Sequence, residues 1–198
     1  MIRRIAAIVE GKGEVRAVPV MLKRIARAVA PDQSVSVDPN PWYIPRGRLL
    51  RDDAEVVKAL DTLAVGIKGR GGILVLFDSD DDCPATLAPE QARRIRNLRR
   101  DLSIAVVMAH REYEAWFLAA AASCAGTAGL HEALADQSHA EATRDCKRWL
   151  TAHMPRGAPY KETLHQALLS EALDIDRARR NSPSFDKLCR EVARLIGD

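Results

Sequence analysis

The sequence predicts an α/β fold with a mostly parallel sheet and a helical C-terminal extension. Three observations support this fold class. Short apolar runs typical of buried strands lie at residues 5–9, 35–37, 73–77 and 104–109. Segments with apolar residues at helical spacing separate these runs, and such alternation is typical of parallel βαβ units. No strand pattern follows residue 122, so we expect an α/β core over residues 1–122 and a helical extension over residues 123–198 that packs on it.

In the first part of the core, the strand at residues 5–9 ends at a Glu-Gly turn. A helix follows over about residues 18–29, with Pro19 near its first turn, where a missing N–H costs little, and Pro31 beyond its end. Residues 39–47 then form a proline-rich loop after the short strand at residues 35–37.

The second part of the core begins with an amphipathic helix over residues 52–68, which glycines terminate. The run at residues 73–77 is the clearest strand, and five residues of the pattern DSDDD follow it directly. A helix at residues 89–100, a strand at 104–109 and a helix at 111–122 complete the core. In the extension we expect helices at residues 143–150, 161–169 and 183–196.

Composition excludes several classes of protein. Of the 198 residues, 47% are hydrophobic and 29% charged, as in an ordinary globular protein and unlike a disordered one. The net charge of +3 is compatible with a nucleic-acid partner without requiring one. The four cysteines form no CxxC pair, and no window approaches the ~20 apolar residues of a membrane span. We therefore expect a cytoplasmic protein with reduced thiols, no signal peptide and no membrane association.

Acidic residues follow two of the predicted strands. Glu10 ends the first strand, and Asp78 and Asp80 follow the strand at residues 73–77. In open α/β sheets ligands bind at the carboxyl ends of the strands, so these side chains should form one negative pocket. Mg²⁺ or Mn²⁺ is the usual partner of such carboxylates, and a metal would let the pocket approach phosphates. The simpler interpretation is a solvated aspartate loop and a glycine turn before a helix.

Other acidic-site classes fit less well or stay open. An EF-hand would need glycine where Cys83 lies and glutamate where Pro89 lies. A nucleotide-sugar transferase with a DxD motif would give Glu10 and Glu14 no role. A phosphatase-like aspartate nucleophile stays open, although no other residue supports it.

Two motifs resemble the paired signature of TOPRIM domains, which occur in topoisomerases, primases and OLD-type nucleases. They are Val9-Glu10-Gly11 followed by Glu14, and Leu76-Phe77-Asp78-Ser79-Asp80. The chain also resembles a small family of bacterial TOPRIM-like proteins of this length, a domain of unknown function with no assigned activity. The matching stretches are VEGKGEV at residues 9–15, DSDDDCP at 78–84, REYEAW at 111–116 and SPSFDKL at 182–188.

The resemblance implies a Rossmann-like TOPRIM core that binds one or two Mg²⁺ or Mn²⁺ ions and cleaves DNA or RNA. The metal ligands expected on this basis are Glu10, Glu14, Asp78, Asp80 and Glu114, and the extra carboxylate Asp82 is a further candidate. The catalytic residues expected are Glu10, Asp78, Asp80 and Lys161, the lysine stabilising charge in the transition state. Relatives of this kind imply an OLD-like ATPase partner in bacterial defence. A TOPRIM-fold regulator that only binds such an ATPase is the alternative.

Arginines near the predicted site are candidates for contacting nucleic acid. They are Arg46, Arg48, Arg93, Arg96 and Arg100, the first two lying close to Trp42 and Tyr43. The ordinary interpretation of such charge runs is a solvated helix face, and that of Lys161 is a surface lysine.

Overall fold

The computed structural model describes residues 2–68 and 70–197 and contains a parallel β-sheet. Strands β1 (Arg3–Val9), β4 (Gly71–Asp78) and β5 (Ser103–Ala109) lie side by side. The short strands β2 (Val35–Val37) and β3 (Trp42–Tyr43) both pair with β1, β2 along its start and β3 along its end. Every strand pair is parallel, so the predicted α/β class with a mostly parallel sheet is confirmed.

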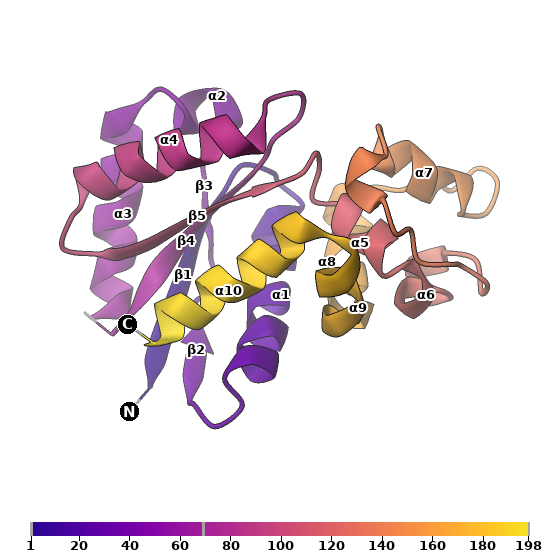
Figure 1. The fold of residues 1–198 in the computed structure, drawn as a ribbon, viewed down its shortest axis with the longest axis horizontal. Coiled ribbons are helices and arrows are strands. Elements are labelled where there is room, and N and C mark those ends of the chain that lie inside the picture. The colour runs from indigo at the N-terminus through magenta and orange to yellow at the C-terminus, as the bar shows by residue number, and fades with distance from the viewer. Residues whose placement is uncertain (1, 69, 198) are drawn as a thin grey trace.

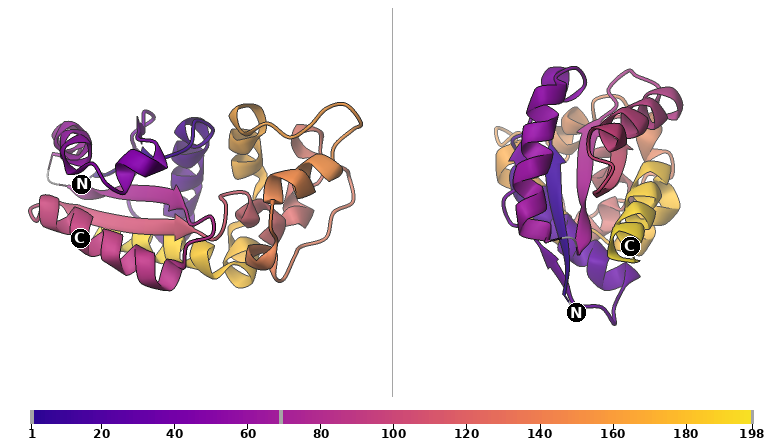
Figure 2. Two further views of the ribbon diagram at one scale, coloured as in Figure 1. Left: turned by 90° about the horizontal axis from the view of Figure 1, so that it is seen from above. Right: turned by 90° about the vertical axis from the view of Figure 1, so that its left-hand side faces the viewer.

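Helices cover both faces of this sheet. Helices α1 (Glu14–Val29) and α10 (Pro183–Gly197) pack on one face, and α3 (Asp53–Ile67) and α4 (Pro84–Leu98) on the other (Figure 1). Alternate residues of each strand feed the two cores, as the period of two in a strand requires. The right-hand view of Figure 2 shows the sheet on edge between these helices. Both faces are therefore buried, which explains the continuous apolar runs of the sequence.

Apart from the short helix α2 (Arg46–Leu49), the remaining helices form a lobe beside the carboxyl ends of the strands (Figures 1 and 2). They are α5 (Ala115–Ala119), α6 (Ala121–Cys124), α7 (Cys146–Ala152), α8 (Glu162–Ala172) and α9 (Ile175–Asn181), with the 3₁₀ turns η1 (Thr127–Gly129) and η2 (Ala140–Ala142). Helix α8 packs along α1, while α10 leaves the lobe and returns to the sheet. The C-terminal part is thus helical as expected, and its last helix is a layer of the α/β core. The boundary at residue 122 stays a prediction.

Several elements differ from their expected bounds. Helix α4 begins at Pro84 instead of residue 89, because proline is well tolerated in the first turn of a helix. The helix expected over residues 111–122 begins only at Ala115, and the residues before it form a turn. Helix α9 is a helix that the apolar pattern did not predict; its N-cap Asp174 accepts a hydrogen bond from the Arg177 N–H.

Two further expectations concern the cysteines and the membrane. The four cysteines, all within the described part of the chain, are unpaired. Within residues 2–68 and 70–197, none of the helices has the length and apolar character that crossing a bilayer requires.

Candidate metal centre

Three carboxylates meet where β1 and β4 end and α1 begins. Glu10 directly follows β1, Asp78 is the last residue of β4, and Glu14 is the first residue of α1. Because β1 and β4 are parallel neighbours, their carboxyl ends lie together. One oxygen from each of the three side chains lies within 4.8 Å of the others. The structure therefore brings Glu10, Glu14 and Asp78 into one cluster, which we call the carboxylate cluster.

Backbone N–H groups hold each of these carboxylates by one oxygen. Glu14 Oε2 accepts hydrogen bonds from the N–H groups of Glu10 and Gly11, both at 3.2 Å. Glu10 Oε1 accepts from the Asp78 N–H at 3.0 Å, and Asp78 Oδ1 from the Tyr113 N–H at 2.8 Å. The other oxygen of Glu10, Oε2, is buried and accepts no hydrogen bond from the described residues. Hydrogen bonds to one oxygen thus orient each side chain, and the second oxygen of Glu10 has no hydrogen-bond donor among the described residues.

A glycine lets the lobe approach this cluster closely. A Cβ atom on Gly13 would lie 2.4 Å from Gln166 Oε1 and 2.8 Å from Glu162 Cβ. Both partners belong to the first turns of α8, which packs against α1. The glycine of the turn is therefore required for space, and it brings α8 next to the carboxylates.

A second set of polar side chains from the lobe lies behind the cluster. Glu114 is fully buried, and its Oε1 accepts hydrogen bonds from Tyr160 Oη at 3.0 Å and Gln166 Nε2 at 3.1 Å. Its Oε2 accepts none from the described residues. Lys147, on α7, pairs with Glu162 through Nζ and Oε1 at 2.6 Å. The lobe therefore contributes two more carboxylates and one cation to the region of the cluster.

Burial makes the charged form of these acids costly. Burial raises the pKa of Glu10 to about 7, although the Asp78 N–H and Arg46 act against the shift. Burial and then the charge of Glu10 raise the pKa of Glu14 to about 8. Asp78 has its pKa raised for the same reasons, burial first and the Glu14 charge second. Burial raises the pKa of Glu114 to about 7. The cluster thus has less positive charge around it than its acids need when ionised.

Lys147 is a lysine whose pKa the nearby buried acids raise. Burial by itself lowers the pKa of its ammonium group, but the charges of Glu114 and Glu162 outweigh this and raise it. Lys161, predicted from the sequence, is exposed at the N-cap of α8, and its N–H donates to His165 Nδ1. The structure therefore places Lys147, and not the side chain of Lys161, in an ion pair beside the buried acids.

The aspartates after β4 lie outside the cluster. Asp80 and Asp82 are exposed, and both pair with Arg46, Asp80 at 3.4 Å from its Nε. Arg46 also donates to the Asp78 carbonyl at 3.2 Å and lies 3.9 Å from Glu10 Oε2. The predicted metal ligands Asp80 and Asp82 are thus drawn to an arginine, and the predicted nucleic-acid contact Arg46 is the cation of this loop.

The other arginines predicted to contact nucleic acid belong to α2 (Arg46–Leu49), to α4 and to the turn after α4, where Arg100 lies. Arg48 pairs with Glu55 at 3.0 Å, and Arg96 donates to the Ile104 carbonyl at 2.9 Å. Arg93 and Arg100 are exposed and have no ion pair within the described chain.

Sequence reasoning missed four polar residues of the lobe that lie near the cluster: Lys147, Tyr160, Glu162 and Gln166. Only one weak signal was available. Glu162 opens an amphipathic helix, where an acidic residue is ordinarily explained by the helix dipole.

One protein-family model matches residues 9–193, a stretch that includes every residue of the cluster and of the polar set behind it. The chain belongs to this family. Its description is "Domain of unknown function (DUF4276)". The predicted membership of a family without an assigned activity is therefore confirmed, whereas the similarity of DUF4276 to TOPRIM domains stays a prediction. No curated protein and no solved structure matches the chain.

Proposed function

We propose that this protein is a nuclease that hydrolyses phosphodiester bonds with a TOPRIM-type acidic site and Mg²⁺ or Mn²⁺. The observation that carries the proposal is the carboxylate cluster itself. Three acids, at the ends of β1 and β4 and at the start of α1, meet within 4.8 Å, and burial raises the pKa of each. Like charges in a buried site repel unless a proton or a cation neutralises them.

The residues fit a hard divalent cation. All the donors are carboxylate oxygens, which suit Mg²⁺ and Mn²⁺, and no histidine or cysteine belongs to the cluster. Cations of this class bind oxygen at roughly 2.0–2.6 Å, so one ion spans the observed separation with little movement. The buried Glu10 Oε2, which lacks a donor, is the oxygen most in need of such a partner. When bound, the ion supplies Lewis-acid stabilisation of phosphoryl charge and acidifies water.

The protein's own cations complete the charge pattern. Arg46 lies on one side of the cluster, 3.9 Å from Glu10, and Lys147 approaches from the lobe. In the proposed reaction Glu10, Glu14 and Asp78 hold the metal. Lys147 stabilises negative charge that develops on the phosphate, a role for which it is better placed than Lys161. Glu114 keeps Tyr160 and Gln166 in position through its two hydrogen bonds.

The position of Asp80 argues against a DxD sugar transferase. That reaction would need both acids of the motif on one metal diphosphate, whereas only Asp78 lies in the cluster and Asp80 pairs with Arg46. The regulator alternative predicts that the cluster is dispensable for function. An OLD-like ATPase partner and a role in bacterial defence rest on the resemblance and stay predictions.

The proposal is tested by metal binding and cleavage measured separately. Mg²⁺ and Mn²⁺ are titrated into wild type, Asp78→Asn and the matched control Asp81→Asn by calorimetry. Each protein is then incubated with single-stranded and duplex DNA and RNA, with metal or with EDTA. We expect wild type and Asp81→Asn to bind metal and to cleave, and Asp78→Asn to do neither. Metal binding without cleavage of any of these substrates would favour the regulator, and absence of metal binding in wild type would refute the metal site.

A further inference from the structure

Helix α1 carries a row of cations on its exposed face. Arg16, Lys23 and Arg27 are separated by seven and four residues, spacings that place them on the same face of a 3.6-residue helix. All three are exposed. The only acidic residue of α1 is Glu14, which is buried in the carboxylate cluster. We call Arg16, Lys23 and Arg27 the α1 row.

No member of the α1 row has an ion pair with any residue that the structure describes. Two of the three arginines of α4 behave differently, since Arg94 pairs with Asp53 and Arg96 with Glu191. Most of the positive charge of α4 is therefore neutralised by acids of the protein, whereas the charge of the α1 row is available to an external anion.

The row connects the carboxylate cluster with a hollow at the other end of α1. Arg16 lies two residues after Glu14, and Arg27 lies eleven residues further on, about 16 Å at 1.5 Å per residue. Lys12, in the turn before α1, is also exposed and extends the positive charge toward Glu10.

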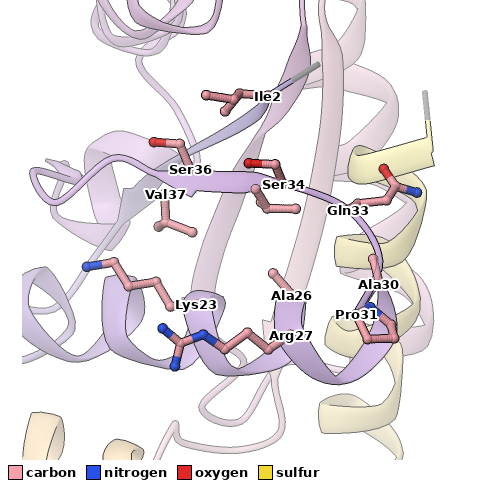
Figure 3. Close-up of a pocket in the computed structure, with 11 residues that line it drawn as sticks. Ile2, Lys23, Ala26, Arg27, Ala30, Pro31, Gln33, Ser34, Ser36 and Val37 are labelled. Carbon is pink, nitrogen blue, oxygen red and sulfur yellow. The ribbon is translucent and has the colours of Figure 1, made fainter.

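The hollow, of about 670 Å³, lies between α1 and β2 (Figure 3). Lys23 and Arg27 line one side of it, and Ser34 and Ser36 belong to the β2 segment on the other side. Among the described residues that line this hollow, none is acidic. Lysine, arginine and serine side chains are the groups that proteins use to contact phosphate and sugar of nucleic acids.

We infer that the α1 row and the hollow beside β2 bind the phosphodiester backbone of a nucleic acid whose bond to be cleaved lies at the carboxylate cluster. The inference rests on the proposed nuclease function and specifies where the substrate lies. It replaces α2 and α4 with α1 as the main source of phosphate contacts. An acidic peptide would also complement these charges. The nucleic acid is favoured because the row leads from the hollow to the proposed metal site.

The test measures binding in EDTA, so that no metal-dependent cleavage interferes. Affinity for labelled single-stranded and duplex oligonucleotides is measured by fluorescence anisotropy between 50 and 200 mM salt. The row variant Arg16→Gln/Lys23→Gln/Arg27→Gln is compared with Lys58→Gln/Arg93→Gln/Arg100→Gln. The control removes the same charges, two arginines and one lysine, from exposed positions of α3, of α4 and of the turn after α4.

We expect the row variant to lose about tenfold or more in affinity at 100 mM salt. The slope of log K against log salt should become shallower by roughly 2–3, since each phosphate contact contributes about 0.7–0.9. The affinity of the control should stay within about twofold of that of wild type, because the charges it removes lie outside the α1 row and the hollow. Equal losses in both variants, or no binding by wild type at low salt, would overturn the inference. So would a polyglutamate peptide that competes as well as an oligonucleotide of equal charge, because the hollow would then belong to an acidic peptide.

Manganese binding separates this inference from the proposed function. The row variant leaves the carboxylates intact and should bind Mn²⁺ as wild type does. Binding of nucleic acid through the α1 row without any metal-dependent cleavage would refute the nuclease and retain the surface. Metal-dependent cleavage that is unchanged in the row variant would refute the role of the α1 row in binding and retain the nuclease.

Discussion

The acids on the two sides of Ser79 have opposite environments, although they belong to one run of the sequence. Asp78 is buried at the end of β4 and shares its site with Glu10 and Glu14. Asp80 and Asp81 are exposed, with side chains that are 62% and 82% accessible.

The two groups also differ in how their charge is neutralised. Arg46 pairs with Asp80, and Arg111 and Arg144 pair with Asp81. The buried acids have no such set of arginines, and their pKa values rise accordingly. The comparison teaches that the number of acids in a run does not identify a metal site. Burial of several acids with too few protein cations does, because it leaves charge for an external ion to neutralise.

The largest expected effect tests the buried side of this comparison. Glu14→Gln keeps an oxygen that can accept from the N–H groups of Glu10 and Gly11 but removes a charge from the cluster. We expect Mn²⁺ affinity to fall more than the ~10–100-fold that supporting residues of metal sites typically cost. The matched variant Asp82→Asn should change it less than about threefold, since exposed pairs contribute little. Calorimetric titration measures both, and equal effects would erase the distinction between the cluster and the loop.

The next effect concerns the cation of the lobe. Lys147→Met should lower metal-dependent cleavage by roughly 10²–10³-fold, as removal of one group that stabilises transition-state charge does. Lys161→Met should change it little, because its side chain is exposed and outside the cluster. Single-turnover rates at saturating metal provide the measurement. A larger loss with Lys161→Met would restore the role that the sequence suggested for that residue.

The pH dependence of stability should also distinguish the buried acids from the exposed aspartates. Folding raises the pKa of Glu14 from 4.5 to about 8 and that of Glu10 to about 7, so the folded state binds more protons than the unfolded state in this window. The pKa values of Asp78 and Glu114 shift in the same direction, although the charge of Lys147 acts against both shifts. Without metal, the free energy of unfolding should therefore fall as pH rises from about 5 to 9, by at most about 1.4 kcal/mol per pH unit for each proton.

Urea unfolding in EDTA at several pH values measures this slope. Added Mn²⁺ should remove or reverse the slope, because the ion binds the ionised carboxylates of the folded state. Stability that rises with pH in EDTA would contradict the burial of unneutralised acids.

The smallest effect tests how the lobe reaches the cluster. Gly13→Ala would place a methyl group against Gln166 and Glu162, so we expect a loss of about 1–3 kcal/mol in the free energy of unfolding. A methyl group on Gly47, in α2, would meet no atom within 4 Å, so Gly47→Ala should be neutral or stabilising by up to about 1 kcal/mol. Urea denaturation of both variants provides the comparison, and equal stabilities would show that α8 can yield at this contact.

Much of the fold could be predicted because local pattern determines it. The apolar runs of β1, β4 and β5 and the periodicity of α3 and α10 correspond to elements of the structure, and β2 matches residues 35–37. Helix α9 could not be found in this way, because it is seven residues long and lacks a distinct apolar stripe.

The candidate site could likewise be predicted from the sequence only in part. That Glu10 and Asp78 lie at one edge follows from two strands of a parallel sheet, and the sequence therefore determined their meeting. Which acids are buried, and which have an arginine, depended on side chains from distant segments. Arg46 takes Asp80, and α7 and α8 bring Lys147 and Glu162 to the cluster. The strand pattern alone determined where the acids gather. The tertiary structure decided which of them are buried with too little positive charge, because burial and charge pairing arise only between segments that folding brings together.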